Sequence, residues 1–208
     1  MSHPKLARPD YDVHELIRDR WSPRAFDADK LVPRAELMRL FEAARWAPSS
    51  GNEQPWRFIA VPRAESSDVW RAVVAGLTIS NQAWAAAAPV LVVGVVRLTQ
   101  EENGTLNRMA WYDAGQAISL LVVQATAQGL SVRQMAGFSH DAIRAACGIP
   151  DGFDPAVIVA IGYAGDPAAL ALERHREAER QPRRRKPLSD IVFENKWGTG
   201  LISTGFPQ

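Results

Sequence analysis

The stretch PVLVVGVV, residues 89–96, decides the fold class of this chain. Nearly every residue in it is β-branched or leucine, so it predicts a strand whose two faces are both buried. Further strands are predicted in WRFIAV (56–61), LSVRQM (130–135) and AVIVAIGY (156–163), with helical periodicity between them. This alternation predicts an α/β or α+β fold, in which helices wrap a sheet. Since no linker or repeat divides residues 1–208, a single domain is expected.

The longest predicted helix, Leu106 to Gln128, is apolar on almost every side. Ala114 and Ile118 belong to one face, and Leu120 with its neighbours makes the opposite face apolar too. A helix of this kind is buried either in a core or in a subunit interface. The charged C-terminal tail holds another apolar segment, 191–193, which either packs on its own domain or is donated to another subunit.

Composition excludes several classes of function. The net charge is +1 over 208 residues, so no global field favours nucleic acid or a membrane surface. A single cysteine, Cys147, excludes an internal disulfide framework and a cysteine-based zinc site, and the four histidines have no metal-ligand spacing. The N-terminus carries charges where an export signal has an apolar core, and no apolar run reaches the ~18 residues of a membrane span. We therefore expect a cytoplasmic protein without a metal centre.

Polar residues alternate in RDRWSPRAF, residues 18–26. In an extended chain Arg20, Ser22 and Arg24 point to one side, where two guanidiniums and a hydroxyl suit a phosphate or another anion. The alternative is a solvated pair of arginines after a helix. A second basic run, Arg183 to Lys186, is either a solvated charge run or a weak nucleic-acid patch.

Two turns offer polar or backbone groups to a ligand. The loop APSSGNEQPW, residues 47–56, lies between Trp46 and Trp56, so it either walls off a flat ligand or is a helix end that feeds a strand. In the later turn QMAGF, the small residues Ala136 and Gly137 either present bare N–H groups to a ligand or connect a strand to a helix.

Common catalytic motifs are missing from the sequence. It contains no G-x-G-x-x-G, no G-x-x-x-x-G-K-[ST] and no G-x-S-x-G. These absences argue against a Rossmann dinucleotide site, nucleoside triphosphate hydrolysis and a serine hydrolase. They leave open that a bound cofactor, rather than a side chain, carries the chemistry.

Taken in order, these segments resemble the FMN-dependent nitroreductase family. RWSPRAF (20–26) is similar to its R-x-S-x-R-x-F motif, and APSSGNEQPWRF (47–58) to its P-S-x-x-N-x-Q-P-W loop. Its later landmarks are resembled by NQAWAAAAPVLVV (81–93), GLSVRQMAGF (129–138) and RKPLSDIVFENKWG (185–198). The similarity covers about residues 13–198.

The resemblance implies an α+β fold with a central, mostly antiparallel sheet wrapped by helices. It implies a homodimer that exchanges C-terminal segments and holds two FMN sites at the subunit interface. NADH or NADPH would be the co-substrate. A hydride would pass via flavin N5 to a small acceptor, which is a nitroaromatic, a quinone or another conjugated molecule, in a ping-pong cycle. Nucleic acid and membranes are not expected as partners.

The resemblance also implies roles for individual residues, with the flavin and not a side chain doing the chemistry. Arg24 would stabilise the reduced flavin near N1 and the C2 carbonyl. Trp84 stands where some members have lysine, and it would cover the flavin or narrow the substrate pocket. The other implied contacts are Arg20, Arg183 and Arg185 at the phosphate, Ser22 at the ribityl chain or ring edge, Asn81 at the N3/O4 edge, the backbone of Ala136 and Gly137 near N5 and O4, and Pro48, Ser49, Ser50 and Asn52 from the other subunit.

Two alternatives stay open. Another flavin chemistry on the same scaffold, such as reductive dehalogenation or flavin fragmentation with oxygen, would use the same cofactor residues. A more distant alternative is a nucleic-acid-binding module that uses Arg183 to Lys186. It predicts a colourless protein whose binding to DNA weakens steeply with salt.

Overall fold

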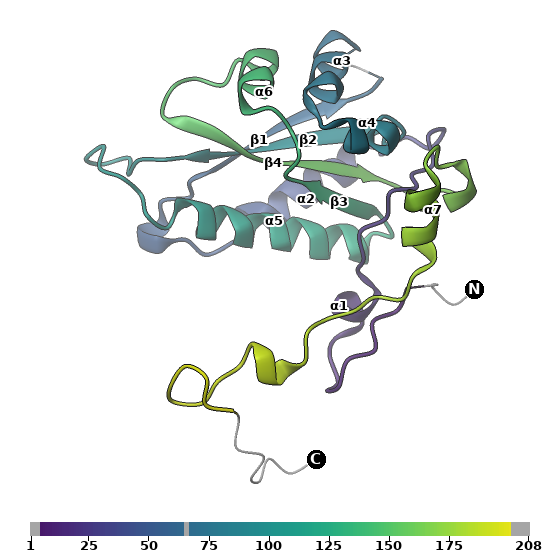
Figure 1. Cartoon of the computed structure of the whole chain (residues 1–208). Coiled ribbons are helices and arrows are strands. Elements are labelled where there is room, and N and C mark those ends of the chain that lie inside the picture. Colours follow the sequence, from purple (N-terminus) through teal and green to yellow (C-terminus); the bar gives the residue numbers. More distant parts are fainter. Residues whose placement is uncertain (1–4, 65–66, 201–208) are drawn as a thin grey trace.

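A computed structural model of the chain describes residues 5–64 and 67–200 (Figure 1). Over these residues the predicted strands form one four-stranded sheet in the order β1-β2-β4-β3, and every neighbouring pair is antiparallel. The strands are β1 (Trp56–Pro62), β2 (Val90–Arg97), β3 (Ser131–Met135) and β4 (Phe153–Gly162). The expected α+β class with an antiparallel sheet is confirmed.

Strand β2 lies inside the sheet, and all of its residues are buried, as the continuous apolar run predicts. Its neighbour β4 begins at Phe153, earlier than the predicted residue 156. The reason is Pro155, which has no N–H for the ladder and therefore argues against a strand in the sequence. In the structure Pro155 pairs with Val95 next to a register shift between Gly94 and Val95, and such an irregularity tolerates proline.

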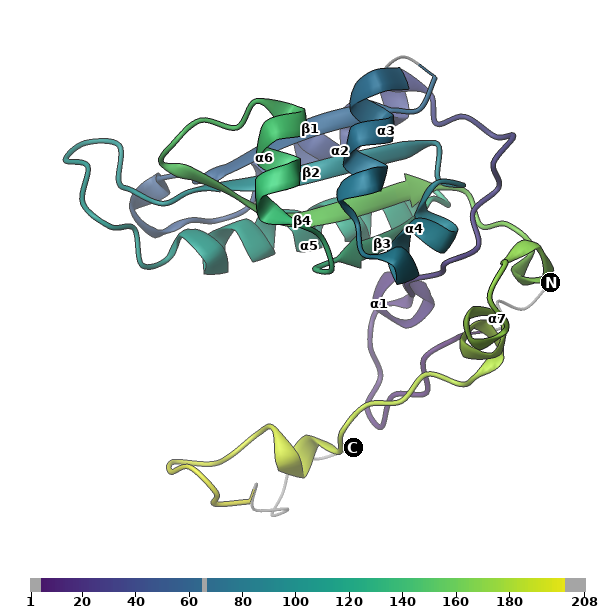
Figure 2. The same cartoon turned by 45° about the horizontal axis from the view of Figure 1, so that its top comes forward.

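Helices cover both faces of the sheet (Figures 1 and 2). The helices on one face are α2 (Arg34–Arg45) and α5 (Ala110–Ala127), and those on the other are α3 (Ser67–Gly76), α4 (Ile79–Ala85) and α6 (His140–Cys147). The first face buries a core around Leu40 and Leu121, and the second buries a core around Val73 and Ile158. The sheet therefore separates two apolar layers.

Helix α5 has one buried face and one exposed face. Ala114 and Leu121 pack into the core, whereas Trp111, Tyr112 and Leu120 are exposed in the single chain. Of the two environments expected for this helix, a core or a subunit interface, the structure shows the core for its inner face. In residues 5–64 and 67–200 no helix has both the length and the apolar character needed to cross a membrane.

Two segments extend away from the sheet on the same side (Figures 1 and 2). The N-terminal arm contains α1 (Glu15–Asp19), and the C-terminal arm follows α7 (Glu173–Arg180). Arg183 ties the arms together, because its Nη1 donates to the carbonyl oxygens of Arg18 at 2.8 Å and Lys5 at 3.3 Å.

The apolar tail segment 191–193 is not a strand, and Ile191 in it is exposed. Short 3₁₀ helices are η1 (Ser50–Asn52), η2 (Pro167–Ala169) and η3 (Leu188–Asp190).

Gly165 holds the segment around Arg24 against the end of the sheet. Its N–H donates to the Ala25 carbonyl at 3.0 Å, and the adjacent Ala164 forms a bridge with Phe26. A Cβ atom on Gly165 would lie 2.5 Å from both the carbonyl carbon and the carbonyl oxygen of Phe26. Backbone atoms cannot rotate aside as a side chain can, so this position requires glycine.

We expect Gly165→Ala to lower the free energy of unfolding by about 1–3 kcal/mol, the usual cost of overpacking. Urea unfolding followed by circular dichroism measures this change. Gly200→Ala is the matched control, because a Cβ there meets nothing within 4 Å. Equal stability of the two variants would contradict the tight contact with Phe26.

Candidate functional site

Arg20, Ser22 and Arg24 were predicted to point to one side, but in the structure they make two separate sets of contacts. Arg20 Nη1 donates to Ser22 Oγ at 3.2 Å, so these two side chains form one group. Arg24 contacts helix α7 instead. Its backbone N–H donates to Glu179 Oε1 at 3.1 Å, and its Nη1 lies 3.8 Å from the same oxygen. The structure therefore places Arg24 in an ion pair that the sequence did not indicate.

Arg133 on β3 joins this region and was not singled out in the sequence. Its Nη1 donates to the Ser22 carbonyl, and its Cζ lies 5.4 Å from the centre of the Trp84 ring. Burial and then the positive charge of Arg24 lower the pKa of Arg133 to about 10. The available signal was a charged residue inside a predicted strand, where arginine is uncommon unless it is paired.

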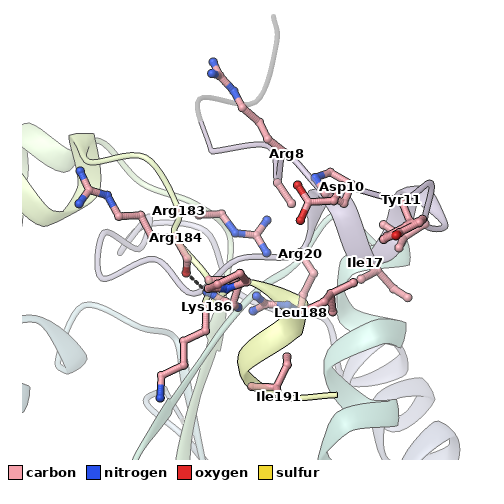
Figure 3. Close-up of a pocket in the computed structure, with 15 residues that line it drawn as sticks. Arg8, Asp10, Tyr11, Ile17, Arg20, Arg183, Arg184, Lys186, Leu188 and Ile191 are labelled. Carbon is pink, nitrogen blue, oxygen red and sulfur yellow. Dashed lines mark hydrogen bonds between the residues drawn. The ribbon is translucent and has the colours of Figure 1, made fainter. Parts of the chain in front are cut away.

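A cavity of about 860 Å³ lies between the two arms and is strongly basic (Figure 3). Its cationic lining residues are Arg8, Arg20, Arg183, Arg184, Arg185 and Lys186, and its one acidic lining residue is Asp10. Burial first, and then the charge of Arg185, lower the pKa of Arg20. Burial first, and then the charges of Arg20 and Arg185, lower the pKa of Arg183. Guanidiniums that repel one another in this way are stabilised by a bound anion. The structure thus brings together all three predicted phosphate contacts.

Asn81 and Gly137 also meet in the structure. Asn81 Nδ2 donates to the Gly137 carbonyl at 3.1 Å, and the Thr78 N–H donates to the same oxygen at 2.9 Å. A Cβ on Gly137 would lie 3.0 Å from both Asn81 Nδ2 and Thr78 Oγ1. The preceding Ala136 is exposed. The small-residue turn after β3 is therefore held by the first turn of α4 and leaves Ala136 accessible.

Trp84 belongs to the core of the single chain. Its side chain is 2% exposed, its ring stacks on Phe26 with centroids 6.2 Å apart, and it lines a small cavity together with Arg24. Trp84 Nε1 has no hydrogen-bond partner in the described part of the chain. The position predicted to face substrate is thus buried here between Phe26 and Arg133.

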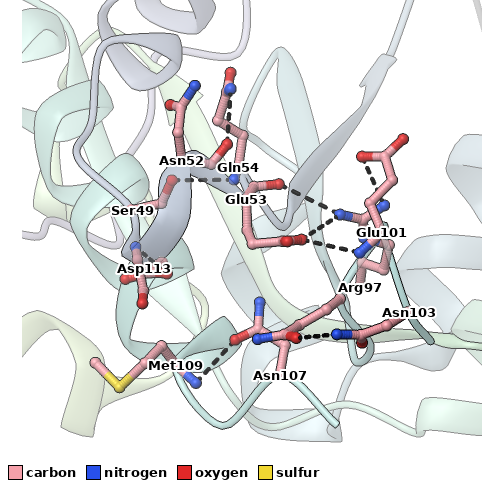
Figure 4. A network of polar contacts seen from close by, with 12 residues as sticks. Ser49, Asn52, Glu53, Gln54, Arg97, Glu101, Asn103, Asn107, Met109 and Asp113 are labelled. Carbon is pink, nitrogen blue, oxygen red and sulfur yellow. Dashed lines mark hydrogen bonds and ion pairs between the residues drawn. The ribbon is translucent and has the colours of Figure 1, made fainter. Parts of the chain in front are cut away.

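The loop with Ser49, Ser50 and Asn52 is rigidly held (Figure 4). Asp113 on α5, 1% exposed, accepts a hydrogen bond from the Ser50 N–H at 3.1 Å, and Ser49 Oγ accepts one from the Gln54 N–H at 3.0 Å. Asn52 has φ +56°, a left-handed conformation that asparagine tolerates better than most residues. Pro48 precedes this loop. Asp113 was missed in the sequence, where the signal was a lone acid in an apolar helix.

An ion pair supports the same loop from its other side. Arg97 Nη2 lies 2.8 Å from Glu53 Oε2, and that oxygen also accepts from the Glu101 N–H at 3.1 Å (Figure 4). Both side chains of the pair are largely buried. The loop is therefore fixed to the ends of β2 and α5 before any ligand binds.

The two groups of predicted site residues lie at opposite ends of α5. The Ser50 loop contacts Asp113 near the start of the helix. Arg20 and Asp19 line a cavity with Thr126, near its end. At 1.5 Å per residue these ends are roughly 20 Å apart. Within a single chain these two groups of predicted site residues are therefore held apart. Among the described residues, no cluster of His, Cys, Asp or Glu is placed to hold a metal ion.

Comparison with known proteins identifies the family. The Nitroreductase family model matches residues 17–163, more than half of the chain. An uncharacterized 15.4 kDa protein in the ask 5' region of Mycolicibacterium smegmatis is 36% identical over 138 residues, covering 66% of this chain and 91% of the relative. An NADH dehydrogenase of Thermus thermophilus is 27% identical over 216 residues, covering 89% and 97%.

A solved structure described as an oxidoreductase containing FMN is also similar. Its TM-score is 0.85 with 35% sequence identity, covering 96% of this chain and 98% of that one. The chain belongs to the Nitroreductase family. Both the predicted family and the nitroreductase-like α+β fold are confirmed.

His175 links the site to acid stability. It is buried on α7 with Nε2 3.3 Å from Ser80 Oγ, and its Nδ1 has no partner in the described residues. Burial lowers its pKa from 6.5, and Arg24, Arg174 and Arg133 lower it further. The unfolded chain therefore takes up a proton at a higher pH than the folded chain does. Stability contributed by neutral His175 is present above about pH 6.5 and is lost as the pH falls toward the lowered value.

We expect the free energy of unfolding to decrease below about pH 6.5, by at most about 1.4 kcal/mol per pH unit from this histidine. Urea unfolding between pH 5 and 8 measures the slope, and His175→Gln should reduce it. The same slope in wild type and His175→Gln would contradict this assignment.

Proposed function

We propose that the chain is an FMN-dependent oxidoreductase that uses NADH or NADPH and acts as a homodimer in the cytoplasm. The observation that carries this proposal is the basic cavity between the arms, which Arg20, Arg183 and Arg185 line, and where burial and then the charge of a neighbouring arginine lower the pKa of Arg20 and of Arg183. A phosphate monoester has the dianionic charge that such a cluster favours.

The residues present fit FMN. The arginines around Arg20 provide charge-assisted donors for its phosphate. Asn81 and Thr78 pack against Gly137, and the adjacent Ala136 is exposed, so the backbone of this turn is held in place with Ala136 accessible to a ligand. The solved relative with 35% identity is described as containing FMN, which supports the same cofactor.

Each side chain has a proposed task. Arg20, Arg183 and Arg185 bind the phosphate, and Ser22 orients the ribityl chain or ring edge. Asn81 binds the N3/O4 edge, while the backbone of Ala136 and Gly137 faces N5 and O4. The partner's Pro48, Ser49, Ser50 and Asn52 complete the site from the second subunit. Trp84 shapes the substrate side from within the core.

FMN, when bound, accepts a hydride from the nicotinamide and passes the electrons to a nitroaromatic, quinone or other conjugated acceptor. The nicotinamide and the acceptor bind in turn to the same face, a ping-pong order. Arg24 places a positive charge at the N1–C2 carbonyl region. A charge-assisted hydrogen bond there contributes about 1.5–3 kcal/mol, or about one to two decades in the equilibrium for reduction.

The position of the two groups of site residues supports the proposed homodimer. They lie at opposite ends of α5, whose outer face exposes Trp111, Tyr112 and Leu120. Two copies that pack α5 against α5 in opposite directions bring the arginine half of one copy to the loop half of the other, twice per dimer. The C-terminal arm extends from the body in Figure 1, as an exchanged segment would.

The first test is colour and reduction. We expect the purified protein to be yellow or to bind added FMN tightly, and to bleach when mixed anaerobically with NADH or NADPH. Subsequent addition of a nitroaromatic or quinone should restore the flavin spectrum. Bleaching that only a halogenated substrate or oxygen reverses would favour the other flavin chemistries. A colourless protein that refuses FMN and binds DNA in low salt would refute the proposal.

The second test is the subunit interface. We expect Leu120→Glu to shift the protein from dimer to monomer in sedimentation experiments and to weaken FMN binding, since a carboxylate on the outer face of α5 would be buried. Val69→Glu is the matched control. Val69 is 38% exposed on α3, across the sheet, and Leu120 is 37% exposed. A Leu120→Glu protein that remains dimeric with unchanged FMN affinity would exclude α5 as the interface.

A further inference from the structure

Helices α4 and α7 face each other across a buried polar seam beside the proposed flavin site. Ser80 and Trp84 are four residues apart on α4, and His175 and Glu179 are four apart on α7, so each pair shares one face of its helix. His175 Nε2 meets Ser80 Oγ at 3.3 Å. Arg24 contacts Glu179 and lines a small cavity with Trp84, which places it in the same seam.

Glu179 is a buried acid. Its side chain is 1% exposed, and Oε1 accepts from the Arg24 N–H at 3.1 Å. Its second oxygen, Oε2, has no hydrogen-bond partner in the described part of the chain. A buried carboxylate that is only half satisfied is costly, because desolvation penalises the charge and few donors offset it. This acid therefore costs stability where it lies, and its charge acts on its surroundings with little screening by water.

More positively than negatively charged side chains lie around Glu179. Arg24 lies 3.8 Å from it, Arg133 binds the Ser22 carbonyl nearby, and Lys5 Nζ donates to the Ala178 carbonyl at 2.5 Å, next to Glu179 in the chain. Burial is the largest cause that lowers the pKa of Lys5 and of Arg133, and the charge of Arg24 lowers both further, whereas Glu179 opposes these shifts. These four groups therefore act on one another, and their sum is positive in a poorly solvated region, where charges interact strongly.

We propose that Arg133 and Glu179 set the reduction potential of the flavin, with Arg133 as a second cation beside Arg24 and Glu179 as the acid that offsets them. The inference rests on the proposed function, because it needs FMN next to Ser22 and Arg24. Reduction adds negative charge at the pyrimidine edge of the flavin. Arg133 stabilises that charge and Glu179 destabilises it. Removing the charge of Arg133 therefore lowers the potential, and removing the charge of Glu179 raises it.

The test is a redox titration of the FMN-loaded full-length protein against reference dyes. We expect Glu179→Gln to raise the equilibrium constant for two-electron reduction about tenfold, or ~30 mV, and Arg133→Gln to lower it by a similar factor. Arg24→Ala, measured beside them, should also lower it. Glutamine keeps the shape of Glu179 and an oxygen that accepts from the Arg24 N–H, so the variant removes mainly the charge.

Charge-keeping variants separate this role from a structural one. Glu179→Asp and Arg133→Lys should keep potentials near the wild-type value. Asp154→Asn, at a carboxylate paired with Arg144 near the start of β4 and outside the part of β4 that pairs with β3, should leave the potential unchanged. If Glu179→Gln does not fold, Arg133→Gln and Arg133→Lys carry the test.

The outcomes distinguish the two proposals. A wild-type protein that binds no FMN overturns both. A protein that binds FMN and is reduced by NAD(P)H, but whose potential does not move in Glu179→Gln and Arg133→Gln, overturns the charge-setting role alone. Shifts of the same sign in the two variants, or an equal shift in Asp154→Asn, also overturn it. Opposite shifts that the charge-keeping variants abolish support it.

Discussion

The structure depends on one helix with two apolar faces. The inner face of α5 packs on the sheet and fixes the core that includes Leu121. Its start holds the polar loop through Asp113, and its end lies beside Arg20. Because a helix is rigid along its axis, the two groups of polar residues are kept a fixed distance apart. The exposed outer face and this separation are the two features on which the proposed dimer rests.

Much of the fold could be predicted from the sequence because its signals are local. The buried run at residues 89–96 is β2, and Ser139 and Gly148 begin and end α6 as a helix cap and a left-handed glycine. The start of β4 was not predictable, since Pro155 argues against a strand and only pairing with β2 at an irregular register allows it. The local pattern therefore gave a wrong start for β4, because pairing with β2 and not the local sequence decides where this strand begins.

The site was less predictable than the fold, for a physical reason. Short motifs mark residues that meet a ligand, and the grouping of Arg20 with Ser22 and of Asn81 with Gly137 agrees with that. Glu179 contacts Arg24 across 155 positions of sequence, and Arg133 meets Ser22 across 111. Such partners are set by how β3 and α7 pack on the rest of the chain. Asp113 is another example, because its carboxylate acts on a loop 63 positions away.

The placement of the two groups of site residues at the two ends of α5 has a genetic consequence. In a dimer of the proposed kind, each complete site takes its arginines from one chain and its loop from the other. A variant damaged only in the arginines and a variant damaged only in the loop would each be inactive alone. When their subunits mix, one site of each mixed pair receives both defects and the other receives neither. Two inactive alleles of this one gene would then complement each other.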